Sequence, residues 1–257
     1  MPRNRNFLVV CTALFGVFVP ATFAQTPYGS AAPAMIATDR PAFTDSSAVV
    51  PAGEFQAENG MLDTGNQGRN TVDLPETLIR IGVGPTTELR FTAPDYYQNS
   101  GFSDFAFGVK QQLLNGAAGF QVSAVVSLSF PTGANAISSH GYDPSFQLPW
   151  SRPLASNWTA AGMLSIYAPT QNGSHFVIGE STFLIDRQLT GPWDAFVEYE
   201  GDFPQAGAPR HLLHFGTAYR IGPKQQIDFH AGAGLSPAAV HHFIGIGYSF
   251  RFSMGRR

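Results

Sequence analysis

The chain has 257 residues, of which 13% are charged and 13% are aromatic, with 27 glycines and a net charge of −3 at pH 7. A low charged fraction with many glycines is typical of short strands and tight turns rather than of solvated helices, and it indicates an all-β chain. The negative charge argues against a nucleic-acid partner, and the length fits one large domain better than two small ones.

The first 24 residues have the features of an export signal peptide. Arg3 and Arg5 precede an apolar run from Phe7 to Val19, and Thr22-Phe23-Ala24 places small residues before a cleavage site. The apolar run has 13 residues, fewer than the roughly 20 that a membrane-spanning helix requires. We predict cleavage after Ala24, which removes Cys11, the only cysteine, and leaves a mature chain without a thiol.

Residues 25–53 are rich in Ala, Pro, Ser and Thr without periodicity, which indicates a periplasmic lead-in segment. After it, apolar and polar residues alternate with a period of two, most clearly in FQVSAVVSLSF (120–130). This alternation predicts twelve strands that together occupy residues 54–252, followed by a basic tail at 253–257. The predicted strands lie near 54–62, 76–83, 87–94, 104–113, 119–130, 145–151, 158–168, 176–188, 193–201, 211–221, 226–234 and 240–252.

The connections between the predicted strands alternate in length. Turn-like connections such as Gly84-Pro85-Thr86 and Asn115-Gly116 follow the even-numbered strands, whereas longer ones such as 63–75 and 131–144 follow most odd-numbered strands. Outer-membrane barrels show this pattern, because their periplasmic turns are short and their outer loops are long. The sequence therefore predicts a transmembrane antiparallel β-barrel of about twelve strands, located in the bacterial outer membrane.

Several charged residues stand between apolar neighbours inside the predicted strands, as Arg80 does between Ile79 and Ile81. A lipid-facing arginine at the middle of the bilayer costs about 2–4 kcal/mol in a barrel, so several would exceed a typical net stability of about 5–15 kcal/mol. We therefore expect these charges to point inward and to set the electrostatics of the lumen. The predicted lumen-lining or binding residues are Arg80, Arg90, Lys110, Glu198, Glu200, Arg220, Asp228 and Arg251.

The stretch FIGIGYSFRF (243–252) resembles the terminal signal by which the barrel-assembly machinery recognises bacterial outer-membrane proteins. The resemblance implies that this machinery is a partner and that outer-membrane lipid covers the apolar face. Five residues follow Phe252, whereas most such proteins end at the final aromatic residue. The residues that carry the signal are Ile244, Ile246, Tyr248, Phe250 and Phe252.

Three blocks of the chain resemble a bacterial family of phenol-degradation meta-pathway transporters. They are ATDRPAFTDSSAVVPAGEFQAENG (37–60), GFSDFAFGVKQQL (101–113) and SLSFPTG (127–133). The resemblance implies an outer-membrane barrel that takes up small, often aromatic or hydrophobic molecules, and it carries over no binding residues. Thr38-Asp39-Arg40-Pro41 matches the opening block of the family. Two interpretations of this part of the lead-in segment remain open: it folds back toward the lumen, or it is a disordered leader.

Metal and hydrolase sites receive little support from the sequence. The pairs His211-His214 and His241-His242 cannot each converge on one ion, because strand residues an odd number apart point to opposite faces. A lipid hydrolase would use Ser138-Ser139-His140 or Ser174-His175, and neither motif has an orienting third partner at a defined spacing.

The carboxylates Glu198 and Glu200 share one face of a predicted strand and could act as an acid and a base. They would lie about 6.6–7 Å apart, and solvated wall charges are the commoner explanation for such a pair. We therefore expect a channel or transporter for small solutes, without catalytic residues, cofactor or metal. A lipid hydrolase, a structural or plugged barrel without transport, and a soluble periplasmic β protein remain the alternatives.

Overall fold

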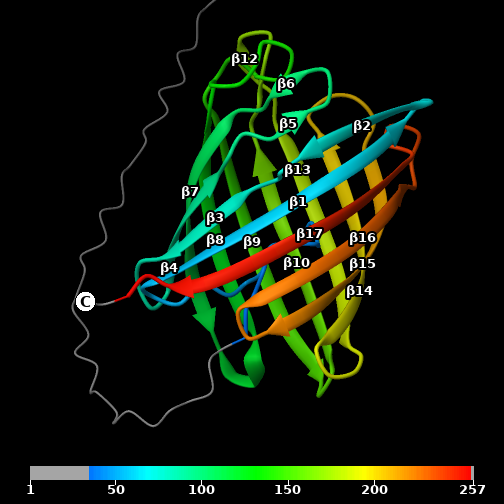
Figure 1. The fold of residues 1–257 in the computed structure, drawn as a ribbon. Helices are drawn as coiled ribbons and strands as arrows, with labels where there is room; N and C mark the ends of the chain where they lie inside the picture. The colour runs from blue at the N-terminus through cyan, green and yellow to red at the C-terminus, as the bar shows by residue number, and fades with distance from the viewer. Residues whose placement is uncertain (1–34, 256–257) are drawn as a thin grey trace, which may run out of the picture. The chain divides into compact units, whose positions relative to one another are not determined.

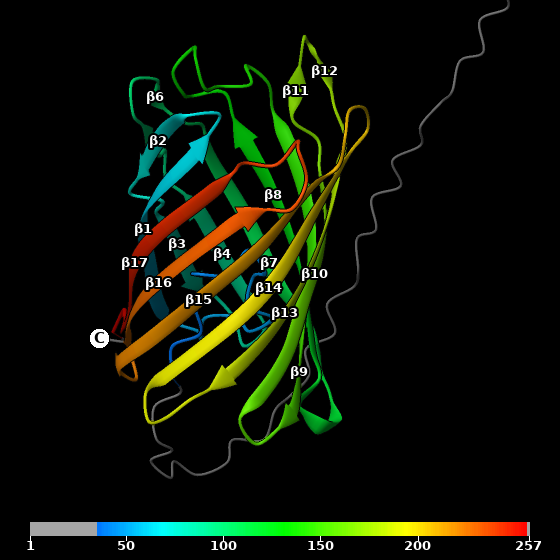
Figure 2. The ribbon, with the colours of Figure 1, turned by 90° about the vertical axis from the view of Figure 1, so that its right-hand side faces the viewer.

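Twelve strands close into a barrel because the last strand pairs with the first. The computed structural model describes residues 35–255, in which β1 (Glu54–Asn66) and β17 (His242–Ser253) run antiparallel over twelve residue pairs. Figures 1 and 2 show the resulting ring of inclined strands. Closure leaves no edge strand with unpaired backbone amides, which is the condition for a sheet to lie in lipid. The prediction of an all-β barrel with about twelve strands is confirmed.

Around the ring the strands follow the order β1, β3, β4, β7, β8, β9, β10, β13, β14, β15, β16 and β17, and each neighbouring pair is antiparallel. The remaining short strands lie outside this order, and η1 is a single 3₁₀ turn. The bounds of the other elements are β2 (Arg69–Leu74), β3 (Leu78–Gly82), β4 (Thr87–Thr92), β5 (Tyr96–Tyr97), β6 (Gly101–Phe102), β7 (Phe105–Asn115), η1 (Ala117–Gly119), β8 (Gln121–Phe130), β9 (Asp143–Ala155), β10 (Trp158–Tyr167), β11 (Thr170–Gln171), β12 (Ser174–His175), β13 (Ile178–Gln188), β14 (Trp193–Pro204), β15 (Arg210–Gly222) and β16 (Gln225–Gly234).

The segment 63–75, predicted as a loop, is largely a hairpin, and this prediction was wrong. β1 continues to Asn66 and pairs with β2 from Leu62 opposite Asp73 to Asn66 opposite Arg69. The hairpin sequence DTGNQGRNTVD lacks the alternating apolar residues that mark a lipid-facing strand. Its pairing depends on β1 rather than on an apolar face, so hydrophobic periodicity could not reveal it.

β9 is longer than the predicted strand at 145–151, although it contains Pro149. Its pairing with β8 stops between Val122 opposite Trp150 and Val125 opposite Gln147. A proline has no backbone N–H to donate to a neighbouring strand, so the ladder is interrupted there. On the other side, β9 pairs with β10 through the proline position, where Met163 lies opposite Pro149.

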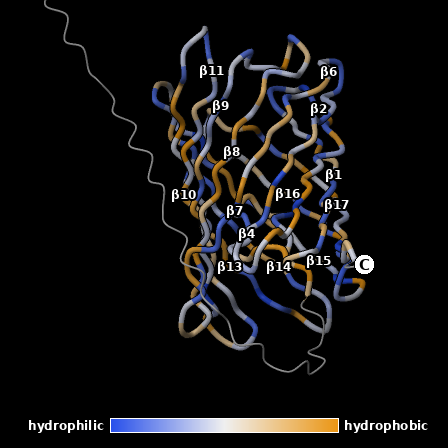
Figure 3. Tube along the Cα trace, turned by 90° about the vertical axis from the view of Figure 1, so that its left-hand side faces the viewer, coloured by the Kyte–Doolittle hydropathy of each residue, from blue (hydrophilic) through white to orange (hydrophobic). Residues whose placement is uncertain are grey.

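The two faces of the sheet differ in polarity, as β17 shows. Ile246 on the outer face is 49% exposed, whereas Ser249 on the inner face is fully buried. Figure 3 shows the same alternation of hydrophobic and hydrophilic residues along the barrel. Within residues 35–255 neither a second sheet nor a helix covers the apolar outer face, which is the arrangement of a barrel wall that faces hydrocarbon.

Among the described residues 35–255, the structure contains no helix that is both long enough and apolar enough to cross a membrane.

The two ends of the barrel differ in their connections. β5, β6, β11 and β12 belong to the longer connections and gather at one end (Figures 1 and 2). The start of β1 and the end of β17 lie at the other end, where short turns such as 223–224 join the strands. In outer-membrane barrels the short turns face the periplasm, so we call this end the periplasmic end and the opposite one the outer end.

A charge on the outer face should destabilise the barrel. Val126, in the middle of β8, is 58% exposed on that face. Val126→Arg should lower the free energy of unfolding in lipid vesicles by about 2–4 kcal/mol, measured by urea titration of tryptophan fluorescence. Val126→Leu is the matched control and should unfold within about 0.5 kcal/mol of the wild type. Equal stability of the arginine variant would mean that this face does not contact hydrocarbon.

Candidate functional site

The candidate site is the barrel lumen and the part of the lead-in segment within it (residues 35–53). Side chains predicted to line the lumen lie inside the ring, but most are buried against other side chains rather than against open water. Exposed fractions run from 0% for Arg80, Lys110 and Glu198 to 8% for Glu200. The residues buried in this way are Arg80, Arg90, Lys110, Glu198, Glu200, Asp228 and Arg251.

Arg220 and Arg251 lie nearer the periplasmic end of the barrel. The side chain of Arg220 is 25% exposed and forms an ion pair with Asp194 of the neighbouring strand β14. Arg251 Nε lies 2.8 Å from Glu54 Oε2 across the β1–β17 seam. Of the predicted residues, Arg220 is therefore the cation that water reaches most easily.

On one wall, three cations surround Asp39 of the lead-in segment, and we call this group the Asp39 cluster. Arg80 Nη1 lies 3.1 Å and Lys110 Nζ lies 3.0 Å from Asp39 Oδ1, and Arg90 donates a hydrogen bond to Asp39 Oδ2. The cations come from β3, β4 and β7, which are neighbours in the ring. Burial by itself would raise the pKa of Asp39, but the three cations lower it well below its usual range.

Two wall carboxylates complete the Asp39 cluster and bind the backbone of the lead-in segment. Glu58 and Glu88 lie 2.9 Å and 2.8 Å from the Arg80 guanidinium. Glu58 Oε2 accepts hydrogen bonds from the backbone N–H groups of Asp39 and Arg40, and Glu88 Oε2 accepts one from Val50. The lead-in segment forms no strand, so these carboxylates satisfy amides that would otherwise be buried without a partner.

On the opposite wall, Glu198 of β14 binds the same segment, and we call this group the Glu198 cluster. Glu198 Oε2 accepts hydrogen bonds from Phe43 N (2.8 Å) and pairs with His214 Nδ1 (2.8 Å). Glu198 Oε1 accepts from Thr44 N (2.7 Å) and Thr44 Oγ1 (2.6 Å). β14 is six positions from β4 around the ring of twelve. The lead-in segment therefore crosses the lumen and is bound on both sides.

The Glu198 cluster continues through two histidines from neighbouring strands. His214 Nε2 lies 3.0 Å from His230 Nδ1, and His230 Nε2 lies 3.4 Å from a guanidinium nitrogen of Arg40. The ring of Phe43 packs on His214 with a centroid distance of 4.6 Å and on Phe243 at 5.5 Å. The sequence prediction considered histidine pairs within one strand and missed this pair, which only the lateral pairing of β15 and β16 creates.

Arg40 lies against two glycines of the inner wall. A side chain at Gly60 or Gly247 would occupy the position of the Arg40 guanidinium, so the close approach requires glycine at both positions. Arg40 Nη1 contacts Glu76 at 2.5 Å, and Nη2 lies 3.5 Å from Asp228. Asp228, one of the predicted wall residues, therefore faces the lead-in segment.

Neither serine–histidine motif brings a histidine ring to a serine hydroxyl. Ser138 Oγ donates to Asp104, and His140 contacts Ser138 through its backbone N–H. His175 Nδ1 lies 2.8 Å from the carbonyl oxygen of Ala168. Within residues 35–255 no hydrogen bond joins a serine side chain to a histidine side chain.

Two cavities lie beside the lead-in segment and at the outer end of the barrel. A cavity of about 280 Å³ separates Thr44 and Ser47 of the lead-in segment from wall residues that include Asp186, Phe196 and Arg220. A second cavity of about 190 Å³ lies toward the outer end, where its lining includes serines of β8 and β9. The lumen thus contains space on both sides of the bound segment.

Comparisons with known proteins agree with this architecture. The barrel is similar to an outer membrane channel from Pseudomonas putida F1, with a TM-score of 0.57, 11% sequence identity, and coverage of 79% of this chain and 97% of that one. It is also similar to the KdgM porin, with a TM-score of 0.56, 12% identity, and coverage of 77% and 99%. At these identities the likeness establishes the fold, which is that of outer-membrane barrels. No curated protein matches the chain in sequence.

The predicted family and the outer-membrane location are confirmed. The family model spans residues 38–252, from the start of the Thr38-Asp39-Arg40-Pro41 block to the last aromatic residue of β17. The match therefore includes most of the segment bound in the lumen and the barrel strands up to Phe252. The chain belongs to the family described as "Putative MetA-pathway of phenol degradation".

Proposed function

We propose that this protein is an outer-membrane channel for small molecules and that the lead-in segment closes the lumen in the present conformation. The observation that carries the proposal is the way this segment is bound. It crosses the lumen between the Asp39 and Glu198 clusters through ion pairs and hydrogen bonds, without joining the sheet. Polar contacts of this kind exchange with water once the segment moves, so the segment can leave without breaking the barrel.

The description of the family suggests small aromatic compounds as the solutes. Aromatic rings inside the lumen support this choice. The ring centroids of Phe43, Phe196 and Phe243 lie 4.6, 5.1 and 5.1 Å from that of His214. Such rings offer an apolar surface on which an aromatic solute can stack. Uptake by a deletion strain, compared between aromatic and aliphatic carbon sources, tests this assignment. Equal growth of the deletion and parent strains on every aromatic source would contradict it.

A structural barrel without transport is the second candidate, favoured by the dense burial of the inner wall. Planar-bilayer recordings distinguish the two, because a channel gives discrete conductance steps and a permanently closed barrel gives none. The recordings also test Arg220, the most exposed of the predicted wall cations. Arg220→Gln should shift the reversal potential in a salt gradient toward cation selectivity, because it removes a positive charge from the periplasmic entrance.

A matched control for this prediction is Arg152→Gln. Arg152 lies in β9 and is exposed. Its replacement by glutamine should leave the reversal potential unchanged. If Arg220→Gln keeps the wild-type reversal potential in conducting channels, Arg220 does not face the ion pathway. If the wild-type protein stays silent in bilayers under all voltages, the structural candidate is favoured.

The barrel-assembly machinery is proposed as the partner that inserts the protein. Ile244, Ile246, Tyr248 and Phe252 of β17 are exposed on the outer face, and Phe250 is half-buried between Phe55 and Phe252. These aromatic and aliphatic side chains support a recognition signal that ends at Phe252. Photo-crosslinking from Tyr248 during assembly in cells would detect the contact, and the absence of any crosslink to the machinery would oppose it.

A further inference from the structure

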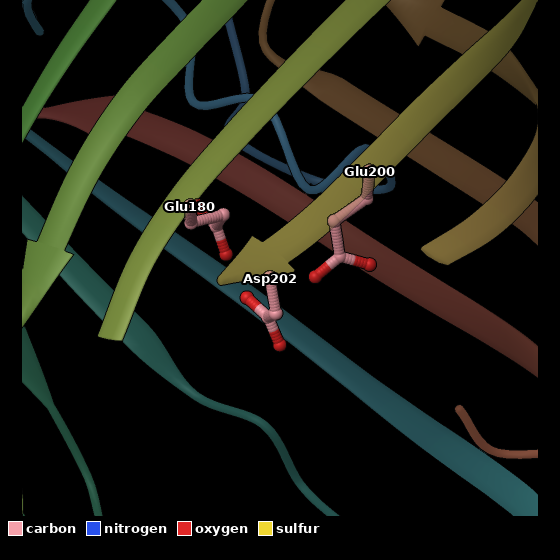
Figure 4. A group of neighbouring side chains, drawn as sticks. All are labelled: Glu180, Glu200 and Asp202. Atoms are coloured by element: carbon pink, nitrogen blue, oxygen red, sulfur yellow. The ribbon is translucent and has the colours of Figure 1, made fainter. Parts of the chain in front are cut away.

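Three carboxylates meet on the inner wall near the outer end of the barrel. Glu180 is the third residue of β13, and Glu200 and Asp202 lie near the end of β14, with Glu180 opposite Asp202 in the register. Figure 4 shows that the three side chains point toward one another. An oxygen atom of each carboxylate lies within 4.8 Å of one in each of the others. We call this group the acidic cluster.

Glu200 is buried, and its Oε2 has no hydrogen-bond partner within residues 35–255. Its exposed fraction is 8%, and no residue between 35 and 255 donates a hydrogen bond to it or forms an ion pair with it. By contrast, Glu180 Oε1 accepts from Ser165 Oγ at 2.9 Å and from Tyr167 OH at 3.3 Å. A buried carboxylate is unfavourable unless a positive charge or hydrogen bonds compensate its charge. The Glu200 side chain, which needs this compensation, points into the acidic cluster.

In the described part of the chain, one cation forms an ion pair with the three carboxylates. Arg210 donates to Asp202 Oδ2 from Nη2 at 2.7 Å and from Nε at 3.0 Å, and its side chain is 42% exposed. Both contacts use the same oxygen atom, so Asp202 Oδ1 stays available. One exposed guanidinium cannot neutralise the cluster, and an external cation would complete the charge balance.

The donor atoms and their spacing indicate which cation fits. All three residues offer carboxylate oxygens, which are the preferred ligands of calcium and magnesium rather than of zinc or copper. Two oxygens on opposite sides of a calcium ion lie about 4.8 Å apart, because each Ca–O distance is about 2.4 Å. The oxygens of the acidic cluster lie within 4.8 Å of one another, so they can reach a common ion. Magnesium requires a nearly ideal octahedron and keeps several waters, whereas calcium accepts irregular sets of carboxylate oxygens.

We propose that Glu180, Glu200 and Asp202 form a calcium-binding site on the lumen wall near the outer end of the barrel. The ion would join β13 to β14 and would neutralise the acidic part of the wall between the lead-in segment and the outer opening. Glu180 and Asp202 are half-buried rather than fully enclosed, so an ion can reach them. Tyr167, which donates to Glu180, also lines the 190 Å³ cavity at this end.

The prediction that no metal binds considered histidine pairs only. Glu180 was not among the predicted wall residues, and Glu200 was paired with Glu198 of the same strand. The lateral pairing of β13 with β14 brings Glu180 to Asp202, and no pattern within one strand shows that proximity.

Calcium titration of the mature protein tests the proposal. The protein would be refolded from inclusion bodies in a non-ionic detergent, so that no lipopolysaccharide contributes cation sites, and then treated with EDTA. Isothermal titration with CaCl₂ should give about one ion per chain, and magnesium should bind at least tenfold more weakly. Glu200→Gln should weaken calcium binding at least tenfold, because it removes a charged ligand while keeping the size of the side chain.

Matched variants separate the site from general effects of charge. Asp143→Asn removes a carboxylate at the same end of the barrel, where Asp143 accepts from Thr170 rather than from a cation, and it should bind calcium as the wild type does. Glu180→Gln keeps an acceptor for Ser165 and serves as the second test if Glu200→Gln does not give the compact, unheated band on SDS electrophoresis. Calcium should raise the melting temperature of the wild type and not that of the glutamine variants.

Two results would overturn the proposal. One is a wild-type chain that binds no calcium, which would mean that the carboxylates are neutralised by protons. The other is equal calcium affinity in the wild type and in both glutamine variants, which would place any bound ion elsewhere. Neither result depends on transport, so the calcium site and the proposed channel function are tested independently.

Discussion

Asp39→Asn should increase the open probability of the channel in planar bilayers by on the order of 100-fold. Asp39 contacts Arg80, Arg90 and Lys110, and asparagine has the same shape without the charge. Removing one member of a buried ion-pair network costs about 3–5 kcal/mol, because the remaining charges are left uncompensated. Release of the lead-in segment admits water to the cations and relieves this cost.

The barrel itself should survive this substitution. The twelve pairs between β1 and β17 do not involve Asp39, so the unheated protein should still migrate as a compact band on SDS electrophoresis. Asp45→Asn is the matched control. Among residues 35–255, Asp45 forms an ion pair with Arg90 alone, and Arg90 keeps Asp39 and Glu88 as partners. Its effect on open probability should be at least tenfold smaller. Wild-type conductance in Asp39→Asn would show that the Asp39 cluster does not hold the channel closed.

Glu198→Gln should also release the lead-in segment, by weakening its binding to the opposite wall. The two oxygens of Glu198 accept from Phe43 N, from Thr44 N and Oγ1, and from His214 Nδ1. A glutamine has one acceptor oxygen and turns an NH₂ group toward two of these donors. Each buried donor left without a partner costs about 1–3 kcal/mol, so we expect a loss of about 2–6 kcal/mol in the binding of the segment.

Single-channel recording and limited proteolysis within residues 35–53 would measure this release. Thr182→Val is the control, because it removes only the hydroxyl partner of Thr44 Oγ1 at 2.6 Å and should cost about 1 kcal/mol. If the segment leaves as one unit, the free-energy effects of Asp39→Asn and Glu198→Gln should add in the double variant. If each cluster opens independently, the single variants should stay nearly silent and only the double variant should conduct.

The alternating pattern of each strand is local information, and it predicted the barrel well. In β8 and β17 every second residue is apolar, and a strand places those residues on one face whatever its neighbours are. The inward direction of Arg80, Arg90 and Lys110 follows from the same parity and from the cost of an arginine in lipid. Fold class, number of strands and membrane location could therefore be predicted from the order of residues alone.

The hairpin of β1 and β2 shows where this reasoning ends. Apart from Val72 and Leu74 its residues are polar or glycine, so the stretch 63–74 has no sustained apolar alternation that would indicate a strand. Pairing with the extended end of β1 supplies the hydrogen bonds that hold it. A strand defined by its neighbour rather than by its own hydrophobic face carries no signal in its own sequence.

The state of the lumen depends entirely on contacts between distant parts of the chain. Phe43 and Glu198 are 155 positions apart, and His214 meets His230 only because β15 and β16 are neighbours. Glu180 and Asp202 meet through the register of β13 and β14 in the same way. Periodicity tells which face a side chain occupies, but it contains no information about which other side chain lies opposite across the barrel. Chain order therefore determined that the protein spans a membrane as a barrel, and only the closed ring decided that its lumen is filled and which charges meet there.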